Sequence, residues 1–241
     1  MTRLDVALVE RGLARSRSQA GQLITGGRVL IGGKPVTKPA HDVNASTRIS
    51  VSADPWVSRA AHKLIGALDG WGIAVPPRVL DAGASTGGFT QVVLSRGAER
   101  VYAVDVGHAQ LAPEVAANPK VVNREGLNLR DLTLDDVDGE PVGLAVGDVS
   151  FISLTLIMEQ ILAVVAPDGI ALLLVKPQFE VGRAALGRTG VVKDAAEALA
   201  CVAKVSAHAA DLGWREQYRA PSALPGEHGN IEWFLGLRRQ S

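Results

Sequence analysis

The candidate catalytic residues of this sequence are two lysines and two carboxylates, namely Lys63, Asp148, Lys176 and Glu232. Each stands at or near the end of a predicted helix or strand, so a fold could bring the four together. A hydroxyl group is a poor nucleophile until a base removes its proton or holds it strongly. A lysine can be such a base where burial and a second ammonium group lower its pKa, while carboxylates orient it. These residue types therefore suit the handling of a hydroxyl proton.

The segment "VLDAGASTGGFTQVV", residues 79–93, predicts a turn that binds a ligand. An apolar strand runs into Asp81, and we expect a helix to begin near Gly87 or Gly88. Glycines let the backbone approach a ligand closely, and a helix start offers unpaired N–H groups. Asp105 ends the next strand-like segment, where a carboxylate can accept hydrogen bonds from ribose hydroxyls. The candidate cofactor-binding residues are Asp81, Gly83, Ala84, Ser85, Thr86, Gly87, Gly88, Phe89, Asp105, Val106 and Asp148.

The segments after residue 57 alternate between strand-like and helix-like patterns. This alternation predicts an α/β fold, with a mostly parallel sheet and helices on both faces. The last two strand-like segments, 215–220 and 230–238, have no helix between them and should form an antiparallel hairpin. The carboxyl ends of parallel strands line one crevice, so Asp148 and Lys176 should converge beside the ligand.

The first part of the chain has a different pattern and predicts a small separate α+β domain. Two helical segments, 4–12 and 16–26, precede short strands on either side of the turn at Gly32-Gly33. Pro55 then interrupts the strand-like pattern. The predicted parts are therefore a domain at 1–52, a linker at 53–57 and a second domain at 58–241.

Charge is unevenly distributed between these two parts. The whole chain has a formal net charge of zero, but residues 1–53 contain eight Lys or Arg and only three Asp or Glu. A basic head on an acidic body suggests that the head meets an anionic polymer, although a solvated surface is the alternative. The pattern "ARSRSQAGQLITGGRVLIGGKPV" resembles the small S4-type RNA-binding domain. The predicted RNA-binding residues are Arg3, Arg15, Arg17, Arg28, Lys34 and Lys38, with Arg59 beyond the linker.

The second part resembles a known family of enzymes. Lys63, Asp148, Lys176 and Glu232 match the K-D-K-E tetrad of FtsJ-like ribose 2′-O-methyltransferases. The motifs "WVSRAAHKL", "LDAGASTGGFT", "DVSFIS", "LVKPQFEVG" and "GNIEWF" are similar to those of the TlyA family, and this resemblance covers essentially the whole chain. It implies a Rossmann-like class I methyltransferase fold with a seven-stranded sheet and one antiparallel strand. It also implies S-adenosylmethionine as cofactor and a cytidine ribose of 16S or 23S ribosomal RNA, in assembled subunits, as target.

Other methyl acceptors and other functions are less well matched by the residues. A base-carbon enzyme needs a cysteine nucleophile, but the single Cys201 stands inside a helical pattern. An exocyclic-amine enzyme typically carries an Asn/Asp-Pro-Pro-aromatic loop where this chain has "GDVSFIS". The alternatives kept open are an inactive factor that binds ribosomal RNA, a methyltransferase acting on transfer RNA or another nucleotide, and a membrane-active haemolysin.

The remaining sequence features concern the membrane, the cellular compartment, metal binding and oligomeric state. The longest apolar run, 161–175, is broken by Pro167-Asp168-Gly169, so no segment is expected to span a bilayer. The single cysteine fits a reducing cytoplasm. The five histidines are widely spaced and predict no metal site. Two linked domains can engage RNA without a dimer, so we expect a monomer. Residues 179–194 read as a mobile loop that could close over RNA, with a plain surface loop as the alternative.

Overall fold

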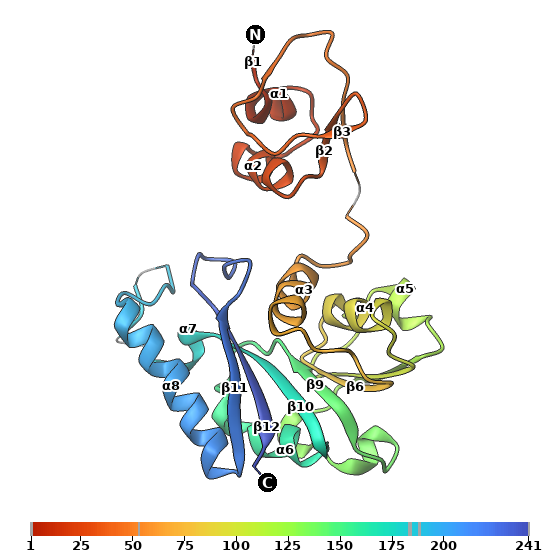
Figure 1. The fold of residues 1–241 in the computed structure, drawn as a ribbon, viewed down its shortest axis with the longest axis vertical. Helices are drawn as coiled ribbons and strands as arrows, with labels where there is room; N and C mark the ends of the chain where they lie inside the picture. The colour runs from red at the N-terminus through yellow and green to blue at the C-terminus, as the bar shows by residue number, and fades with distance from the viewer. Residues whose placement is uncertain (1, 53, 183–184, 188, 241) are drawn as a thin grey trace. The chain divides into compact units, whose positions relative to one another are not determined.

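The computed structural model of the chain describes residues 2–52, 54–182, 185–187 and 189–240. The chain forms two compact units, Met1–Pro55 and Trp56–Ser241 (Figure 1). The first unit has its own apolar core, in which Leu4, Leu8 and Ile24 are fully buried. Each unit can therefore bury apolar side chains without the other.

Unit 1 contains two helices and short antiparallel strands. Its elements are β1 (Thr2–Arg3), α1 (Leu4–Glu10), α2 (Arg17–Thr25), β2 (Val29–Ile31), β3 (Lys34–Pro35), β4 (Asp42–Val43) and β5 (Ile49–Val51). Strand β2 lies between β3 and β5, and β1 pairs with β4. Gly32 and Gly33 join β2 to β3 with φ of 58° and 81°, a conformation that glycine adopts without strain. The two helices and this hairpin agree with the sequence pattern, whereas β1 and β4 are two residues long and were not predicted.

Unit 2 is built on one seven-stranded sheet. The strands are β6 (Arg78–Ala82), β7 (Arg100–Asp105), β8 (Val121–Glu125), β9 (Val142–Gly147), β10 (Val165–Val175), β11 (Trp214–Pro221) and β12 (Trp233–Arg239). Their order across the sheet is β11-β12-β10-β9-β6-β7-β8. Strand β12 runs antiparallel to both β10 and β11, and the β10–β9, β9–β6, β6–β7 and β7–β8 pairs are parallel. The predicted mostly parallel sheet with one antiparallel strand is confirmed.

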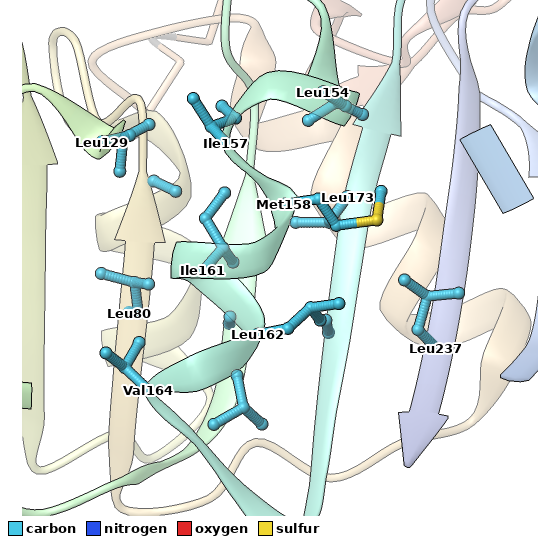
Figure 2. Packing of buried hydrophobic residues seen from close by; sticks show 14 of the residues in the cluster. Leu80, Leu129, Leu154, Ile157, Met158, Ile161, Leu162, Val164, Leu173 and Leu237 are labelled. Carbon is cyan, nitrogen blue, oxygen red and sulfur yellow. The ribbon is translucent and has the colours of Figure 1, made fainter. Parts of the chain in front are cut away.

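Helices cover both faces of this sheet. They are α3 (Ala60–Trp71), α4 (Gly88–Ser95), α5 (Pro113–Ala116), α6 (Met158–Ala163), α7 (Pro177–Glu180) and α8 (Ala195–Asp211). Along β10, Leu172 and Leu174 pack with residues of α3 and α4, whereas Leu173 packs with residues of α6 on the other face. This alternation follows from the two-residue period of a strand. Figure 2 shows the apolar cluster on the α6 face of the sheet, with Met158 and Ile161 of α6 near Leu173 and Leu80.

Candidate active site

The first pair of predicted catalytic residues meets where two neighbouring strands end. Asp148 directly follows β9, and Lys176 directly follows β10. Because these strands are parallel neighbours, their carboxyl ends lie side by side. The Nζ atom of Lys176 is 2.7 Å from Oδ1 of Asp148 and donates a hydrogen bond of 2.8 Å to Oγ of Ser150. Lys176 is buried, so its ammonium group is held in one place by two oxygen atoms.

The second pair joins a helix to the segment before the last strand. Nζ of Lys63, on α3, donates to Oε2 of Glu232 at 2.6 Å, and both residues are buried. Glu232 was expected within the last hairpin strand, but β12 begins one residue later, at Trp233. The other oxygen of Glu232, Oε1, accepts a hydrogen bond of 3.2 Å from Nε2 of Gln178. The carboxylate is thus bound on both sides.

One cavity of about 350 Å³ brings the four residues together. Its walls include Lys63, Asp148, Lys176 and Glu232, along with Phe151 and Gln178. Arg59, which was predicted to bind RNA, is exposed and also lines this cavity. The site therefore combines one buried ion pair, Lys63–Glu232, and one partly buried pair, Lys176–Asp148, with exposed residues such as Arg59 that a polar substrate can reach.

Phe151 is an unusual feature of the cavity rim. Its side chain is 91% exposed, its backbone has φ of 66°, and its ring centroid lies 5.3 Å from that of Phe179. Glu180 fixes the following turn, because its carboxylate accepts hydrogen bonds from Oγ of Ser153 at 2.5 Å and from the N–H of Leu154 at 2.8 Å. An aromatic face held in water beside a polar cavity is suited to stacking on a flat ligand. The sequence interpretation did not identify Phe151 or Gln178 as site residues, although both stand within the motifs that resemble the TlyA family.

The glycine turn after β6 is shaped for close approach. Gly83 has φ of 83°, and a Cβ atom there would lie 3.0 Å from the Val149 side chain and 3.1 Å from the Asp148 carbonyl oxygen. Gly87 has φ of 93° and precedes α4, which begins at Gly88 as the sequence predicted. A smaller cavity of about 140 Å³ lies against this turn. Its lining includes Gly83, Ala84, Ser85, Thr86, Gly88 and Phe89, and it shares Asp148, Ser150 and Lys176 with the larger cavity.

Asp81, at the start of this turn, is fully buried. Its Oδ2 atom accepts a hydrogen bond of 2.7 Å from Oγ1 of Thr90, whereas Oδ1 has no hydrogen-bond partner among the described residues. Burial raises the pKa of this carboxyl group to about 7, and the neighbouring charges of Asp148 and Asp105 act in the same direction. A buried carboxyl oxygen without a partner is costly, so a donor supplied by a ligand would stabilise it.

Asp105 ends β7 beside the turn. Its carboxylate accepts hydrogen bonds from the N–H groups of Ser85, at 2.9 Å, and Gly107, at 2.7 Å. A carboxylate has about four acceptor positions, so Asp105 keeps capacity for the two hydroxyls of a ribose. The next residue, Val106, is 66% exposed and offers an apolar surface. The small cavity, Asp81 and Asp105 together fit the amino-acid and ribose parts of an adenosyl amino acid, which is the chemistry of S-adenosylmethionine.

Glu125 holds the loop that follows Asp105. Its carboxylate accepts three hydrogen bonds, from the backbone N–H groups of Ala109 (2.9 Å), Gln110 (2.7 Å) and Leu111 (2.9 Å). These bonds, most of all the one from Leu111, lower the pKa of Glu125. Leu111 in turn packs where a Cβ atom at Gly87 would stand, so the loop and the glycine turn fit together. Ala109 has a left-handed backbone conformation, with φ of 53°, and the hydrogen bonds to Glu125 stabilise it.

The predicted RNA-binding residues of unit 1 fall into two groups. Asp5 is buried and binds both Arg3, at 3.0 Å, and Arg17, at 3.0 Å. Hydrogen bonds from these two guanidinium groups lower the pKa of Asp5 to about 2. Arg28 is bound by Asp54 at 3.1 Å and by the carbonyl oxygen of Ser52. Arg15, Lys34 and Lys38 form the second group, and all three are exposed.

The loop predicted to be mobile includes Arg183 and Arg188, which lie outside the described residues. In the part that is described, Leu186 and Val192 form an antiparallel bridge. Buried Asn230 contacts this bridge, since its Oδ1 accepts from the N–H of Val192 at 3.0 Å and its Nδ2 donates to the carbonyl of Gly190 at 3.1 Å. The loop is thus tied to the segment that carries Glu232.

Two kinds of feature are absent from the described residues. Across residues 2–52, 54–182, 185–187 and 189–240, no cluster of three His, Cys, Asp or Glu side chains could hold a metal ion. Within the same ranges, no helix is long and apolar enough to cross a membrane.

Known proteins share both the sequence and the fold of this chain. Residues 56–239 match the FtsJ-like methyltransferase family, and residues 2–49 match the S4 domain. The chain is 48% identical to the 16S/23S rRNA (cytidine-2′-O)-methyltransferase TlyA of Mycobacterium tuberculosis, over 99% of this chain and 90% of that protein. It is 36% identical to Hemolysin A of Brachyspira hyodysenteriae, over 96% of this chain and 98% of that protein.

A solved structure agrees with these matches. A candidate hemolysin from Streptococcus thermophilus superimposes with a TM-score of 0.76 at 35% identity, covering 100% of this chain and 89% of that one. The sheet order and the site at its carboxyl edge define a Rossmann-like methyltransferase, which is an enzyme. The chain belongs to the FtsJ-like methyltransferase family and, within it, to the TlyA proteins.

Proposed function

We propose that this enzyme methylates the ribose 2′-oxygen of a cytidine in ribosomal RNA. The single observation that carries this proposal is the pair of ion pairs, Lys176–Asp148 and Lys63–Glu232, on one cavity beside the glycine turn. A lysine held by a carboxylate is suited to a hydroxyl acceptor, whereas methylation of a base carbon would need a thiolate. Cys201 is buried in α8, and burial raises the pKa of its thiol, so it is unsuited to that role.

The methyl donor we propose is S-adenosylmethionine. When bound, it supplies a methyl group on a positively charged sulfur, so that an oxygen nucleophile can take the methyl group while the sulfur leaves as an uncharged thioether. We assign its amino-acid part to the turn of Gly83–Gly88 and Asp81, and its ribose to Asp105. Support comes from the unpartnered Oδ1 of Asp81, the crowding at Gly83 and the free acceptor capacity of Asp105.

Lys176 is the proposed base for the 2′-hydroxyl. Asp148 and Ser150 hold its Nζ atom at the mouth of the turn, where the acceptor oxygen and the donor must meet. In its neutral amine form, Lys176 would accept the proton of the 2′-hydroxyl at this nitrogen. Lys63 and Glu232 line the same cavity, and their fixed charges orient the ribose. The protein thus supplies alignment and a place for one proton.

The target nucleotide must leave its stack in folded RNA before its ribose can enter the cavity. This unstacking costs a few kcal/mol, which contacts elsewhere must offset. We assign one such contact to Phe151, whose exposed ring can stack on the extruded base, and others to the basic side chains of unit 1. An S4 match over residues 2–49 and ribosomal RNA in the name of a relative support this assignment.

The test is methyl transfer from labelled S-adenosylmethionine to unmodified small and large ribosomal subunits. Wild type should label RNA, and alkaline hydrolysis should leave the label in a resistant dinucleotide, since a 2′-O-methyl group blocks cleavage. Lys176→Met should lower the rate by at least about a hundredfold. Lys120→Met, at an exposed lysine of unit 2, is the matched control and should keep full activity. Label in bases, or in no ribosomal RNA, would refute the proposal.

A further inference from the structure

Gln178 connects the two ion pairs of the site. It is the second residue of α7 and stands two positions after Lys176, so one short segment carries both side chains. Its Nε2 atom donates to Oε1 of Glu232, whose other oxygen is bound by Lys63. Gln178 is therefore the link between the chain segment of one pair and the carboxylate of the other.

The orientation of the Gln178 amide is fixed by charge. Its NH₂ group must face Glu232, because the amide oxygen would be repelled by the carboxylate. The amide oxygen then points elsewhere, and it is buried without a hydrogen-bond partner among the residues described. A buried acceptor without a partner destabilises the fold. If packing were the role of this side chain, an apolar residue of equal length would serve better.

We propose that Gln178 is a positioning residue, which holds the Glu232 carboxylate in the orientation that the Lys63 ammonium group and the substrate ribose require. The proposal rests on the function proposed above. The side chain acts through Glu232 and takes no proton itself. Its unpartnered amide oxygen is the structural cost of having a donor at this place.

The first test compares Gln178→Met with wild type and with Gln217→Met, at an exposed glutamine of β11. Gln178→Met should lower kcat by about ten- to a hundredfold, because a carboxylate that rotates no longer fixes the ribose. Its affinity for S-adenosylmethionine should stay within about twofold, and its Tm should change little, because the variant removes the unpartnered amide oxygen but also the donor to Oε1 of Glu232. A kcat equal to that of wild type, or a lower Tm with a normal kcat, would overturn the proposal.

The second test needs no methyl transfer. Gln178→Glu places a second carboxyl group against Glu232, and two adjacent carboxylates cannot both ionise without cost. The other charged or titratable side chains on the same cavity are Arg59, Lys63, Asp148, Lys176, Glu227 and His228. The Tm of Gln178→Glu should be close to that of wild type at pH 5 and should fall below it by pH 8, as the shared proton is lost. Gln217→Glu is the control and should show no such divergence.

The outcomes separate the two proposals. Equal Tm differences at pH 5 and pH 8 would show that residue 178 does not face Glu232, and would overturn the inference. An active wild type with an equally active Gln178→Met variant would remove the role of Gln178 alone. A wild type that binds S-adenosylmethionine but methylates no ribosomal RNA would remove the proposed function and, with it, this role.

Discussion

Lys63 and Glu232 are 169 residues apart in the chain, yet their charged groups lie 2.6 Å apart in a buried ion pair. The helix before the sheet supplies the cation, and the segment before the last strand supplies the anion. Removing two charges from water is expensive, and their attraction compensates only when both are present. This relationship makes the pair a sensitive probe of both stability and catalysis.

Loss of one partner should destabilise the fold strongly. Lys63→Met or Glu232→Gln alone should lower the free energy of unfolding by about 3–5 kcal/mol, or about as much as an uncompensated buried charge costs. The double variant should lose less than the sum, and urea unfolding measures the difference. The exposed pair Arg96–Asp69 is the control, and Arg96→Met should cost at most about 1 kcal/mol. Additive losses in the double variant would show that the two buried groups do not interact.

Phe151 should matter for RNA and not for folding. Its ring is almost fully exposed, so Phe151→Ala removes little buried surface, and the Tm should change only slightly. If the ring stacks on the target base, the loss of about 1–3 kcal/mol should lower kcat/KM for ribosomal subunits by about five- to 150-fold. Leu156→Ala, at a residue that is 54% exposed, is the matched control and should leave kcat/KM unchanged. Equal kcat/KM values for both variants would argue against stacking.

Asp81 should make stability fall as pH rises. Its folded-state pKa of about 7 lies above the ordinary value of 3.8, so the folded state favours the protonated form. Stability from this group is complete below about pH 4 and is lost progressively as pH rises towards 7. In Asp81→Asn this titration is absent. The free energy of unfolding of wild type, relative to that of Asp81→Asn, should therefore be lower at pH 8 than at pH 5, by urea unfolding without cofactor. An equal difference at both pH values would contradict this expectation.

Glu125 should support the binding of S-adenosylmethionine. In Glu125→Gln the side chain keeps its shape but loses its charge, and its NH₂ group cannot accept from the loop at 109–111. We expect the Kd for S-adenosylmethionine to rise about tenfold, by calorimetry, with kcat at saturating cofactor nearly unchanged. Glu114→Gln, at an exposed residue of α5, should bind the cofactor like wild type. A lower kcat without a change in Kd would assign Glu125 to another role.

The exposed basic residues of unit 1 should set the salt dependence of RNA binding. Each phosphate contact contributes about 0.7–0.9 to the slope of log K against log salt concentration. Replacing Arg15 and Lys34 with alanine should therefore reduce the slope by about one unit per residue. Arg11 is the contrasting case, because its guanidinium group binds the carbonyl oxygens of Thr47 and Asn44. Arg11→Ala should therefore lower the Tm of unit 1 and leave the slope of log K against log salt concentration nearly unchanged. An unchanged slope in the first variant would place the RNA elsewhere.

Much of the fold could be predicted because each element has a local signal. The strands β6, β7 and β9 are short apolar runs, and α4 starts at a glycine pair. The edge strand β8 was missed, since its residues are only partly buried and its sequence, "VVNRE", is half polar. The apolar pattern of residues 154–165 predicts one continuous helix, whereas α6 begins only at Met158 and β10 already at Val165. A continuous apolar stretch has no period that could mark this boundary.

Some residues of the candidate site could likewise be predicted from the sequence, and others could not. Asp148 and Lys176 could be predicted because residues that follow parallel strands must share one edge of the sheet. The contact of Gln178 with Glu232 could not, since it joins residues 54 positions apart through the exact course of two loops. The exposure of Phe151 depends on its left-handed backbone, which no pattern of apolar residues reveals. The roles of all these residues stay predictions until the variants are measured.

The position of β12 has a consequence for how the protein is made. This strand is made after β10 and β11, yet it pairs with β10 on one side and β11 on the other. Until it arrives, both neighbours expose unpaired edges, and the sheet cannot close. The segment just before it brings Glu232, so the same late event completes the sheet and the second ion pair. Synthesis that stops before residue 230 would therefore leave a chain that lacks both the central strand of this edge and the Lys63–Glu232 pair.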